Sequence, residues 1–178
     1  MITSNPYVGT FTGRKVHFLN PHTDEIHIDD ITQSLGMQCR FNGHVKKFYS
    51  VAEHSVHVAR LVLERTDDKR QALYALLHDA SEAYLCDIQR PIKLTLTNYE
   101  DIEKRLQDCI FAKYDAPLHS HVTDYIDKHI VRVEAEQLYP VAPDWVEQYD
   151  RIDMQVKCWE PIVAQSQFQH MFKVLTDA

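Results

Sequence analysis

The chain has 178 residues, enough for one ordinary domain that buries roughly two thirds of the surface of the unfolded chain. Hydrophobic residues make up 44% and charged residues 25%, which argues against a disordered chain and against a membrane protein. The net charge of -7 disfavours a nucleic-acid polymer as partner, and the 4 glycines disfavour many-stranded sheets and glycine loops that bind phosphate. The unusual number is 11 histidines.

Cysteine spacing and the start of the chain bear on its location. No two cysteines are close enough for a CxxC zinc or redox pair. Residues 1–7 are polar, without the apolar stretch of a signal peptide, and no apolar run approaches a membrane span. We therefore expect a reduced cytoplasmic setting and no membrane partner.

The N-terminal third is mixed until a strong helix signal at Ser50. Residues 7–18 carry β-prone side chains around two glycines, which predicts a short hairpin. A short helix is expected from Asp29-Asp30 to about Leu35. Ser50 and Glu53 form a capping box at the start of the first strong helix. Its apolar positions recur at helical spacing and are Val51, Val58, Leu61 and Val62.

Two histidines of that helix differ in their neighbours. His54 lies on the apolar face, whereas His57 lies on the other side with Glu53 and is expected at the surface. A second helix is expected from Asp67-Asp68 to about Leu85, apolar all round over residues 72–77 and then delivering His78-Asp79 and Glu82.

Three further helical segments complete the expected fold. One starts near Thr97 with a second capping box, and one spans Ser120 to Leu138 with Asp127 among its apolar positions. Residues 145–175 read as two helices divided near Pro161. The inward-facing positions expected in these helices are Tyr99, Ile102, Leu106, Ile110, Val122, Tyr125, Ile126, Ile130 and Val133. The sequence predicts a mainly α bundle of five to seven helices in a single domain over 1–178, with a hairpin at about 7–18 and a helical core at about 29–175.

Polar residues stand where apolar ones are expected at His54, His78-Asp79 and Asp127. An ionised carboxylate buried without a partner is very costly, and a shared divalent cation removes that cost. Imidazole and carboxylate together suit Zn, Mn, Fe, Co and Ni, and four such ligands with room for water are typical of a catalytic site. Singly, each has a simpler interpretation: a satisfied core histidine at His54, or an ion pair of Asp127 with a neighbouring base.

The sequence around these positions resembles a known family. SVAEHS surrounds His54, LLHDASE runs from Leu76 to Glu82 and is followed by Asp87, and CRFNGH covers Cys39 to His44. These stretches resemble the HD-domain phosphohydrolases, in the small branch of bacterial 5'-deoxynucleotidases and phage dATP triphosphohydrolases. The resemblance covers about residues 10–138 and implies an HD-domain helical bundle.

The resemblance also implies roles for single residues. It implies one divalent transition metal, Zn, Co or Mn with Fe or Ni as alternatives. Its implied ligands are His54, His78, Asp79 and Asp127, with Asp124 in reserve for the last. Implied catalytic residues are Glu82 for water or proton transfer, Arg40 for phosphate and Asp87 for the sugar hydroxyl or a proton. The implied substrate-binding residues are Arg40, Phe41, His44, Asp87 and Lys93, with a structural hydrogen bond to a loop as the alternative for His44.

Two departures from the family pattern bear on the substrate. Phe41 stands where deoxynucleotidases often have tryptophan, and Gln89-Arg90 precede Pro91 where that segment is usually proline-rich. The leading expectation is hydrolysis of a deoxynucleoside triphosphate such as dATP to nucleoside and triphosphate. The alternative is a 5'-deoxynucleotidase acting on deoxynucleoside monophosphates. Lower alternatives are another HD phosphodiesterase and an inactive nucleotide-binding protein.

The resemblance and the histidine count lead to the remaining expectations. Relatives self-associate, so a homo-oligomer in a bacterial cell or phage-infected host is expected. The other histidines fit no ligand spacing, and most are expected at the surface. They are His17, His22, His27, His119, His121, His129 and His170.

Overall fold

The computed structural model describes residues 5–177, so the expectation for the start of the chain lies partly outside the described residues. Strands β1 (Val8–Gly9) and β2 (Lys15–Val16) pair antiparallel, with Val8 opposite Val16. The predicted N-terminal hairpin is therefore confirmed.

Among residues 5–177, six helices have nine or more residues, which confirms the expected mainly α bundle. They are α1 (Ile28–Met37), α2 (Val51–Thr66), α3 (Lys69–Leu77), α6 (Tyr99–Lys113), α7 (His121–Leu138) and α8 (Pro161–Thr176). Short single-turn pieces lie between them: α4 (Glu82–Leu85), α5 (Arg90–Lys93) and the 3-10 helices η1 (Arg40–Gly43) and η2 (Asp144–Gln148).

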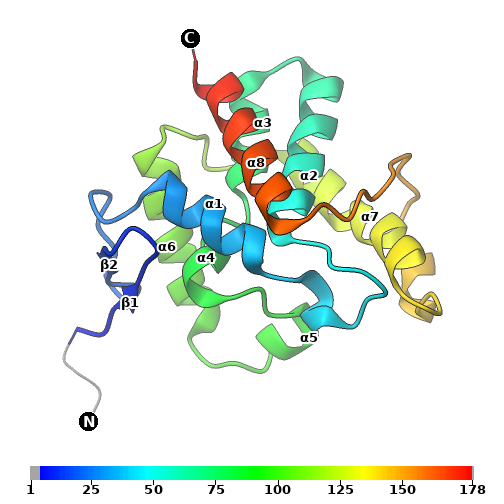
Figure 1. Cartoon of the computed structure of the whole chain (residues 1–178), viewed down its shortest axis with the longest axis horizontal. Helices are drawn as coiled ribbons and strands as arrows, with labels where there is room; N and C mark the ends of the chain where they lie inside the picture. Colours follow the sequence, from blue (N-terminus) through cyan, green and yellow to red (C-terminus); the bar gives the residue numbers. More distant parts are fainter. Residues whose placement is uncertain (1–4, 178) are drawn as a thin grey trace.

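Helix α2 is the central element of the bundle. It packs against α1, α3, α7 and α8, and α8 lies across α1, α2 and α3 (Figure 1). Its residues from Val51 to Ala59 are all buried, polar ones included, so the helix carries His54 into the middle of the molecule. Apolar side chains from the surrounding helices close the core, among them Ile31, Leu76, Ile130 and Phe168.

The start of α2 follows the prediction only in part. The Ser50 hydroxyl accepts a hydrogen bond from the backbone N–H of Glu53 at 3.0 Å, as a capping box requires. The Glu53 carboxylate instead accepts backbone N–H groups of Lys157, Cys158 and Trp159 at 2.6–2.9 Å. The buried carboxylate thus holds the segment before α8 against α2.

The C-terminal prediction of two helices is wrong in its first half. In place of the first of these two helices, the structure has only the short η2 (Asp144–Gln148), and residues 149–160 contain no helix. The backbone N–H groups that Glu53 binds lie within this segment and are therefore not free for a helical ladder. Helix α8 begins at Pro161, as predicted.

The second predicted helix is interrupted. Helix α3 ends at Leu77, a turn covers residues 78–81, and α4 begins at Glu82. At the break, the ring of His78 turns back to hydrogen-bond the carbonyl of Ala75 at 2.7 Å. The N-cap of α6 is Asn98, one residue after the predicted Thr97, because Asn98 has a left-handed backbone with φ 66° and does not continue a helical turn from Thr97.

Three side chains are placed differently from the prediction. Tyr125 is 42% exposed, because its hydroxyl reaches out to donate to Asp150 at 3.0 Å. His57 is buried, since its ring stacks on Trp159 and its Nε2 lies 3.3 Å from Glu53. His129 is also buried, and its Nδ1 accepts the backbone N–H of Asp150.

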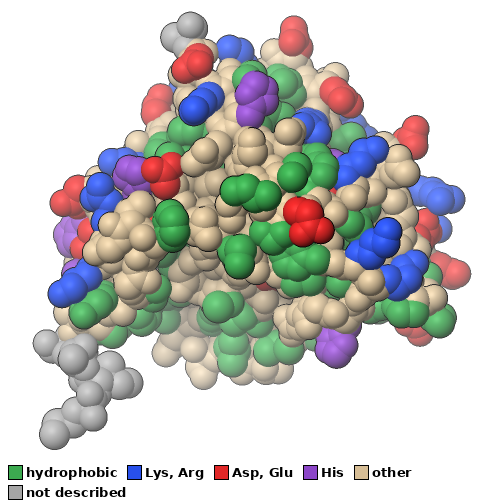
Figure 2. Space-filling view, in the orientation of Figure 1, with side chains coloured by type: hydrophobic (Ala, Val, Ile, Leu, Met, Phe, Trp, Pro, Cys, Tyr) green, Lys and Arg blue, Asp and Glu red, His purple; other side chains and the backbone are tan. Residues whose placement is uncertain are grey.

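The surface carries charges of both signs. Figure 2 shows acidic and basic side chains interspersed around the rim of the face in view, with hydrophobic side chains towards its middle.

Among the helices of residues 5–177, none combines the length and apolar character that a membrane crossing requires.

Candidate active site

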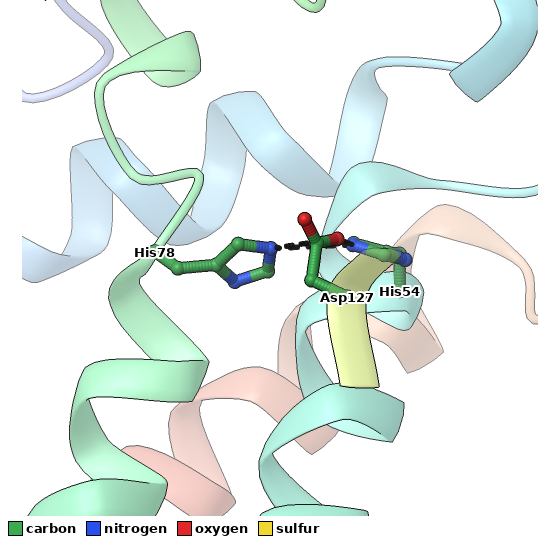
Figure 3. A group of neighbouring side chains, drawn as sticks. All are labelled: His54, His78 and Asp127. Atoms are coloured by element: carbon green, nitrogen blue, oxygen red, sulfur yellow. Dashed lines mark hydrogen bonds and ion pairs between the residues drawn. The ribbon is translucent and has the colours of Figure 1, made fainter. Parts of the chain in front are cut away.

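Three side chains from three different elements of the bundle meet at one point, with Asp127 on its solvent side. His54 comes from α2, His78 from the end of α3 and Asp127 from α7 (Figure 3). The Oδ1 atom of Asp127 lies 3.1 Å from Nε2 of His54 and 3.3 Å from Nε2 of His78, and the two nitrogens are 3.3 Å apart. Two donors bound tetrahedrally to one zinc ion at about 2 Å lie roughly 3.3 Å apart, so the spacing suits a single ion.

Asp79 joins this group from the turn after α3. Its Oδ2 atom lies 3.3 Å from Nε2 of His78 and 3.5 Å from Nε2 of His54. The interruption between α3 and α4 therefore places the adjacent side chains of His78 and Asp79 at one point. The structure brings together all four residues that the sequence predicted as metal ligands.

The outer nitrogen of each imidazole is already engaged. Nδ1 of His54 lies 2.7 Å from the Glu134 carboxylate, and Nδ1 of His78 donates to the carbonyl of Ala75 at 2.7 Å. With the protons on Nδ1, both Nε2 lone pairs face the oxygens of Asp79 and Asp127. Lone pairs that converge in this way repel one another unless a cation lies between them, so the residues fit a divalent transition metal.

The pKa values of His54 and His78 also indicate that the carboxylates around them favour positive charge. Burial and Arg40 lower the pKa of His54, but Glu134 and Asp127 outweigh them and raise it to about 9. Burial also lowers the pKa of His78, whereas Asp79 and Asp127 raise it above its usual value. The carboxylates therefore favour a cationic neighbour, which a proton or a metal ion supplies.

Glu134 is a part of the site that sequence reasoning missed. It is fully buried, accepts the Tyr49 hydroxyl at 2.6 Å and contacts both His54 and Arg40. Burial raises its pKa, but His54 and Arg40 lower it to about 2, so it is ionised. The available signal was its position seven residues after Asp127, two turns along the same face of a helix.

The guanidinium of Arg40 lies next to the carboxylates of Asp79 and Glu134. The backbone N–H of Arg40 donates to the carbonyl of Tyr49 at 2.9 Å, while its guanidinium lies 3.5 Å from Asp79 and 3.4 Å from Glu134. Burial lowers the pKa of Arg40, but the charges of Glu134, Asp87 and Asp79 outweigh burial and raise the pKa above its usual value. The guanidinium is therefore permanently charged. The next residue, Phe41, has a left-handed backbone with φ 56°, a strained conformation that often marks functional sites.

Glu82 and Lys93 lie beside the metal-ligand group. Glu82 is buried, its Oε2 has no hydrogen-bond partner among residues 5–177, and Lys93 Nζ lies 3.9 Å from its Oε1. Burial and the like charges of Asp79 and Asp87 raise the pKa of Glu82 well above its usual value. Lys93 also donates to Glu103 at 2.7 Å, which orients its ammonium group.

Gln38 connects Glu82 and Asp87 and was also missed from the sequence. Its amide nitrogen donates to the carbonyl of Glu82 and its amide oxygen accepts the N–H of Asp87, both at 3.0 Å. Burial raises the pKa of Asp87, although nearby Arg40 lowers it. The amide thus fixes the path of the chain between two predicted catalytic residues.

A cleft of about 600 Å³ opens next to the Arg40 loop, and the exposed His44 lies on its wall. It is lined by Gly43, His44, Val45, Gln89, Tyr139 and Pro140. Phe41 packs edge-on against Tyr139, with ring centroids 5.4 Å apart, and forms part of the support for this wall.

Comparison with known proteins identifies the family. Residues 42–177 match the family described as 5'-deoxynucleotidase YfbR-like. The chain belongs to this family. It is 37% identical to the uncharacterized protein YfdR of Escherichia coli K12, over 74% of this chain and 72% of the relative. It is 34% identical to the uncharacterized protein RCAP_rcc00048 of Rhodobacter capsulatus, over 71% and 70% of the two chains.

Membership of the YfbR-like family confirms the predicted HD-domain family and a metal-dependent nucleotide phosphohydrolase. The family description agrees better with the 5'-deoxynucleotidase alternative than with the leading dATP triphosphohydrolase expectation. His54, His78 and Asp127 could hold the divalent metal that this family implies. The names of the two relatives describe no activity.

The reserve ligand Asp124 does not join the YfbR-like site. It lies in a separate exposed group with His119 and His121, two histidines for which the sequence indicated no ligand spacing.

Proposed function

We propose that the chain hydrolyses 2'-deoxynucleoside 5'-monophosphates to nucleoside and inorganic phosphate, using one divalent transition metal. The observation that carries the proposal is the convergence of His54, His78 and Asp127 within 3.3 Å of one another, in a member of a family described as 5'-deoxynucleotidase-like. Under this proposal Asp79, 3.3 Å from His78, is the fourth ligand.

A divalent cation in this group supplies Lewis-acid chemistry, which lowers the pKa of water and withdraws charge from a phosphoryl oxygen. The protein's part is to hold the ligands in place. Glu134 orients the ring of His54, and the Ala75 carbonyl orients the ring of His78.

Arg40 is proposed to bind the phosphate. Its guanidinium contacts Asp79 and Glu134 through Nη1 and Nη2, so it stands beside the proposed ligands as a fixed planar cation. A guanidinium fork binds two phosphate oxygens at once and stabilises the charge that develops on them during attack. Lys93, half-buried next to Glu82, adds a second positive charge.

Glu82 is proposed to hold the attacking water and move its proton. Water forms a new bond to phosphorus while the bond from phosphorus to the 5' oxygen breaks, and that oxygen needs one proton to leave as the nucleoside hydroxyl. The unpartnered Oε2 of Glu82 is an acceptor free for this task. Asp87, held by Gln38, is proposed to contact the sugar.

The cleft beside Arg40 supports a nucleoside as the leaving group. Its wall includes the imidazole of His44, which offers hydrogen bonds, and the ring of Tyr139, which offers an aromatic face. With Phe41 behind Tyr139, this cleft is proposed to accept the base and to influence the choice between deoxyribose and ribose.

A substrate panel with the purified full chain tests the proposal. Deoxynucleoside monophosphates, ribonucleoside monophosphates and dATP are incubated with Co²⁺, Mn²⁺ or Zn²⁺, and the products are identified by phosphorus NMR. Orthophosphate from the deoxynucleoside monophosphates is expected. Tripolyphosphate from dATP instead would favour the triphosphohydrolase.

Matched variants assign the activity to this site. Asp79→Asn is expected to abolish turnover, whereas Asp101→Asn, an exposed carboxylate in the first turn of α6, is expected to leave it unchanged. No phosphorus-containing product from any nucleotide would refute the proposed function.

A further inference from the structure

A second group of metal-ligating side chains lies at the start of α7, outside the active site. It consists of His119, His121 and Asp124, all exposed, whose ligand atoms lie within 4.8 Å of one another. It shares no residue with the group formed by His54, His78 and Asp127. We propose that His119, His121 and Asp124 form a second, peripheral binding site for a transition-metal ion such as Zn²⁺.

The three residues each bring one donor atom within 4.8 Å of the others, and the shortest contacts use both ring nitrogens of His119, of which one can bind a given ion. Nε2 of His119 lies 2.9 Å from Nδ1 of His121, and Nδ1 of His119 lies 3.5 Å from Oδ2 of Asp124. The two imidazole rings are perpendicular, with centroids 4.2 Å apart. Nitrogens at this separation need to move apart by only a few tenths of an ångström to share one ion, since tetrahedral zinc ligands lie roughly 3.3 Å apart.

The backbone beneath these side chains is anchored. Ser120 and Thr123, which alternate with the three donors, are buried, and the Ser120 hydroxyl accepts the N–H of Thr123 at 3.2 Å. The same hydroxyl donates to Gln71 on α3 at 3.2 Å. The donors therefore project from a helix start that is fixed to the bundle, which lowers the entropy that an ion must overcome on binding.

The donor set selects the class of ion. Two imidazoles and one carboxylate suit Zn²⁺, Co²⁺, Ni²⁺ and Cu²⁺, whereas Mg²⁺ prefers oxygen ligands in octahedral geometry. Half of the Asp124 side-chain surface and more than half of that of His119 remain exposed, so water completes the coordination. The net charge of -7 favours cation binding at the surface in general.

A second site changes what a measured ratio of metal ions to protein chains implies about the active centre. Two metal ions per chain would otherwise indicate a binuclear active centre, the arrangement of other HD phosphodiesterases. Asp124 stands three residues before Asp127 on α7, so the two sites lie on successive turns of one helix without sharing a ligand. The proposal does not depend on the proposed function, since zinc occupancy is measured without turnover.

Zinc stoichiometry of the full chain tests the proposal. The protein is freed of metal with a chelator, dialysed against Zn²⁺ and analysed by mass spectrometry for bound zinc. The wild type is expected to hold two ions, and His119→Ala with His121→Ala is expected to hold one. Excess Mg²⁺ is expected to displace neither ion from the wild type.

Two further variants complete the test. His22→Ala with His170→Ala removes two exposed histidines elsewhere and is expected to keep two ions. Asp124→Asn retains both imidazoles and is expected to weaken binding of the second ion, as seen by calorimetry. Equal zinc content in the wild type and the His119→Ala, His121→Ala variant, at either one or two ions, would overturn the proposal.

Discussion

At the scale of single residues, Glu134 is expected to tune the metal site through His54 without touching the ion. Glu134→Gln keeps the shape but replaces the ionised acceptor of the His54 Nδ1 proton and the buried partner of Arg40. We expect metal affinity to fall about 10–100-fold, measured by competition with a chromophoric chelator. Tyr49→Phe, which removes only one hydrogen bond to Glu134, serves as the matched control with a smaller effect. Unchanged affinity in Glu134→Gln would contradict the orienting role.

Arg40 is expected to act through the shape of its guanidinium as well as its charge. Arg40→Lys retains the charge but loses the planar fork that contacts Asp79 and Glu134 and is proposed to bind phosphate. We expect kcat/KM to fall about 10²-fold in steady-state assays, the typical loss for one donor to a developing charge. Lys46→Ala, at an exposed cation six residues on, is the control and should change little. A kcat/KM equal to that of the wild type would remove Arg40 from the proposed mechanism.

At the scale of elements, the segment before α8 depends on one carboxylate in α2. Glu53→Gln keeps one oxygen for the N–H groups of Lys157 and Cys158, but it removes the negative charge and turns an NH₂ group towards the N–H of Trp159. Hydrogen bonds to charged groups each contribute about 1.5–3 kcal/mol, so we expect the free energy of unfolding to fall by about 2–4 kcal/mol. For a chain of this length, Tm should fall roughly 5–15 °C in a thermal scan.

The control for this prediction lies on the same helix. Glu64→Gln changes an exposed carboxylate of α2 and should leave Tm within the usual small range of surface substitutions. If Glu53→Gln melted at the same temperature as Glu64→Gln, residues 157–159 would not be held by the buried carboxylate.

At the scale of the whole molecule, periodicity predicted the long helices well because an apolar stripe reports which face of a helix is buried. The start of α2 at Ser50 and the hairpin follow from local chemistry alone. The interruption at residues 78–81 does not follow from local chemistry. It depends on the positions of His78 and Asp79 relative to α2 and α7. The apolar run before it indicated burial but carried no signal for the end of the helix.

The residues of the two candidate metal sites also divide into those that local sequence patterns indicate and those that depend on tertiary contacts. The four proposed metal ligands were found because polar residues interrupt apolar patterns and match a family pattern. Glu134 and Gln38 were missed because their partners come from other elements, α2 and η1 for the first and the α4 region for the second. His121 and Asp124, three residues apart on α7, share a helix face, but His119 precedes the N-cap Ser120, where helical spacing predicts no position. The contacts of Glu134 and Gln38 depend on tertiary structure, which local patterns do not encode.

Metal binding is expected to stabilise the entire bundle, because the proposed ligands come from α2, the turn after α3, and α7. An ion at a free concentration 100 times its dissociation constant adds about 2.7 kcal/mol, which raises Tm by roughly 5–11 °C for a chain of this length. Addition of Zn²⁺ to the chelator-treated protein should show this rise in a thermal scan, and chelator should reverse it. Asp79→Ala should lose most of the rise, whereas His119→Ala with His121→Ala should retain the larger part, because an ion at the start of α7 connects no remote elements. Equal shifts in the wild type and Asp79→Ala would show that the stabilising ion binds elsewhere.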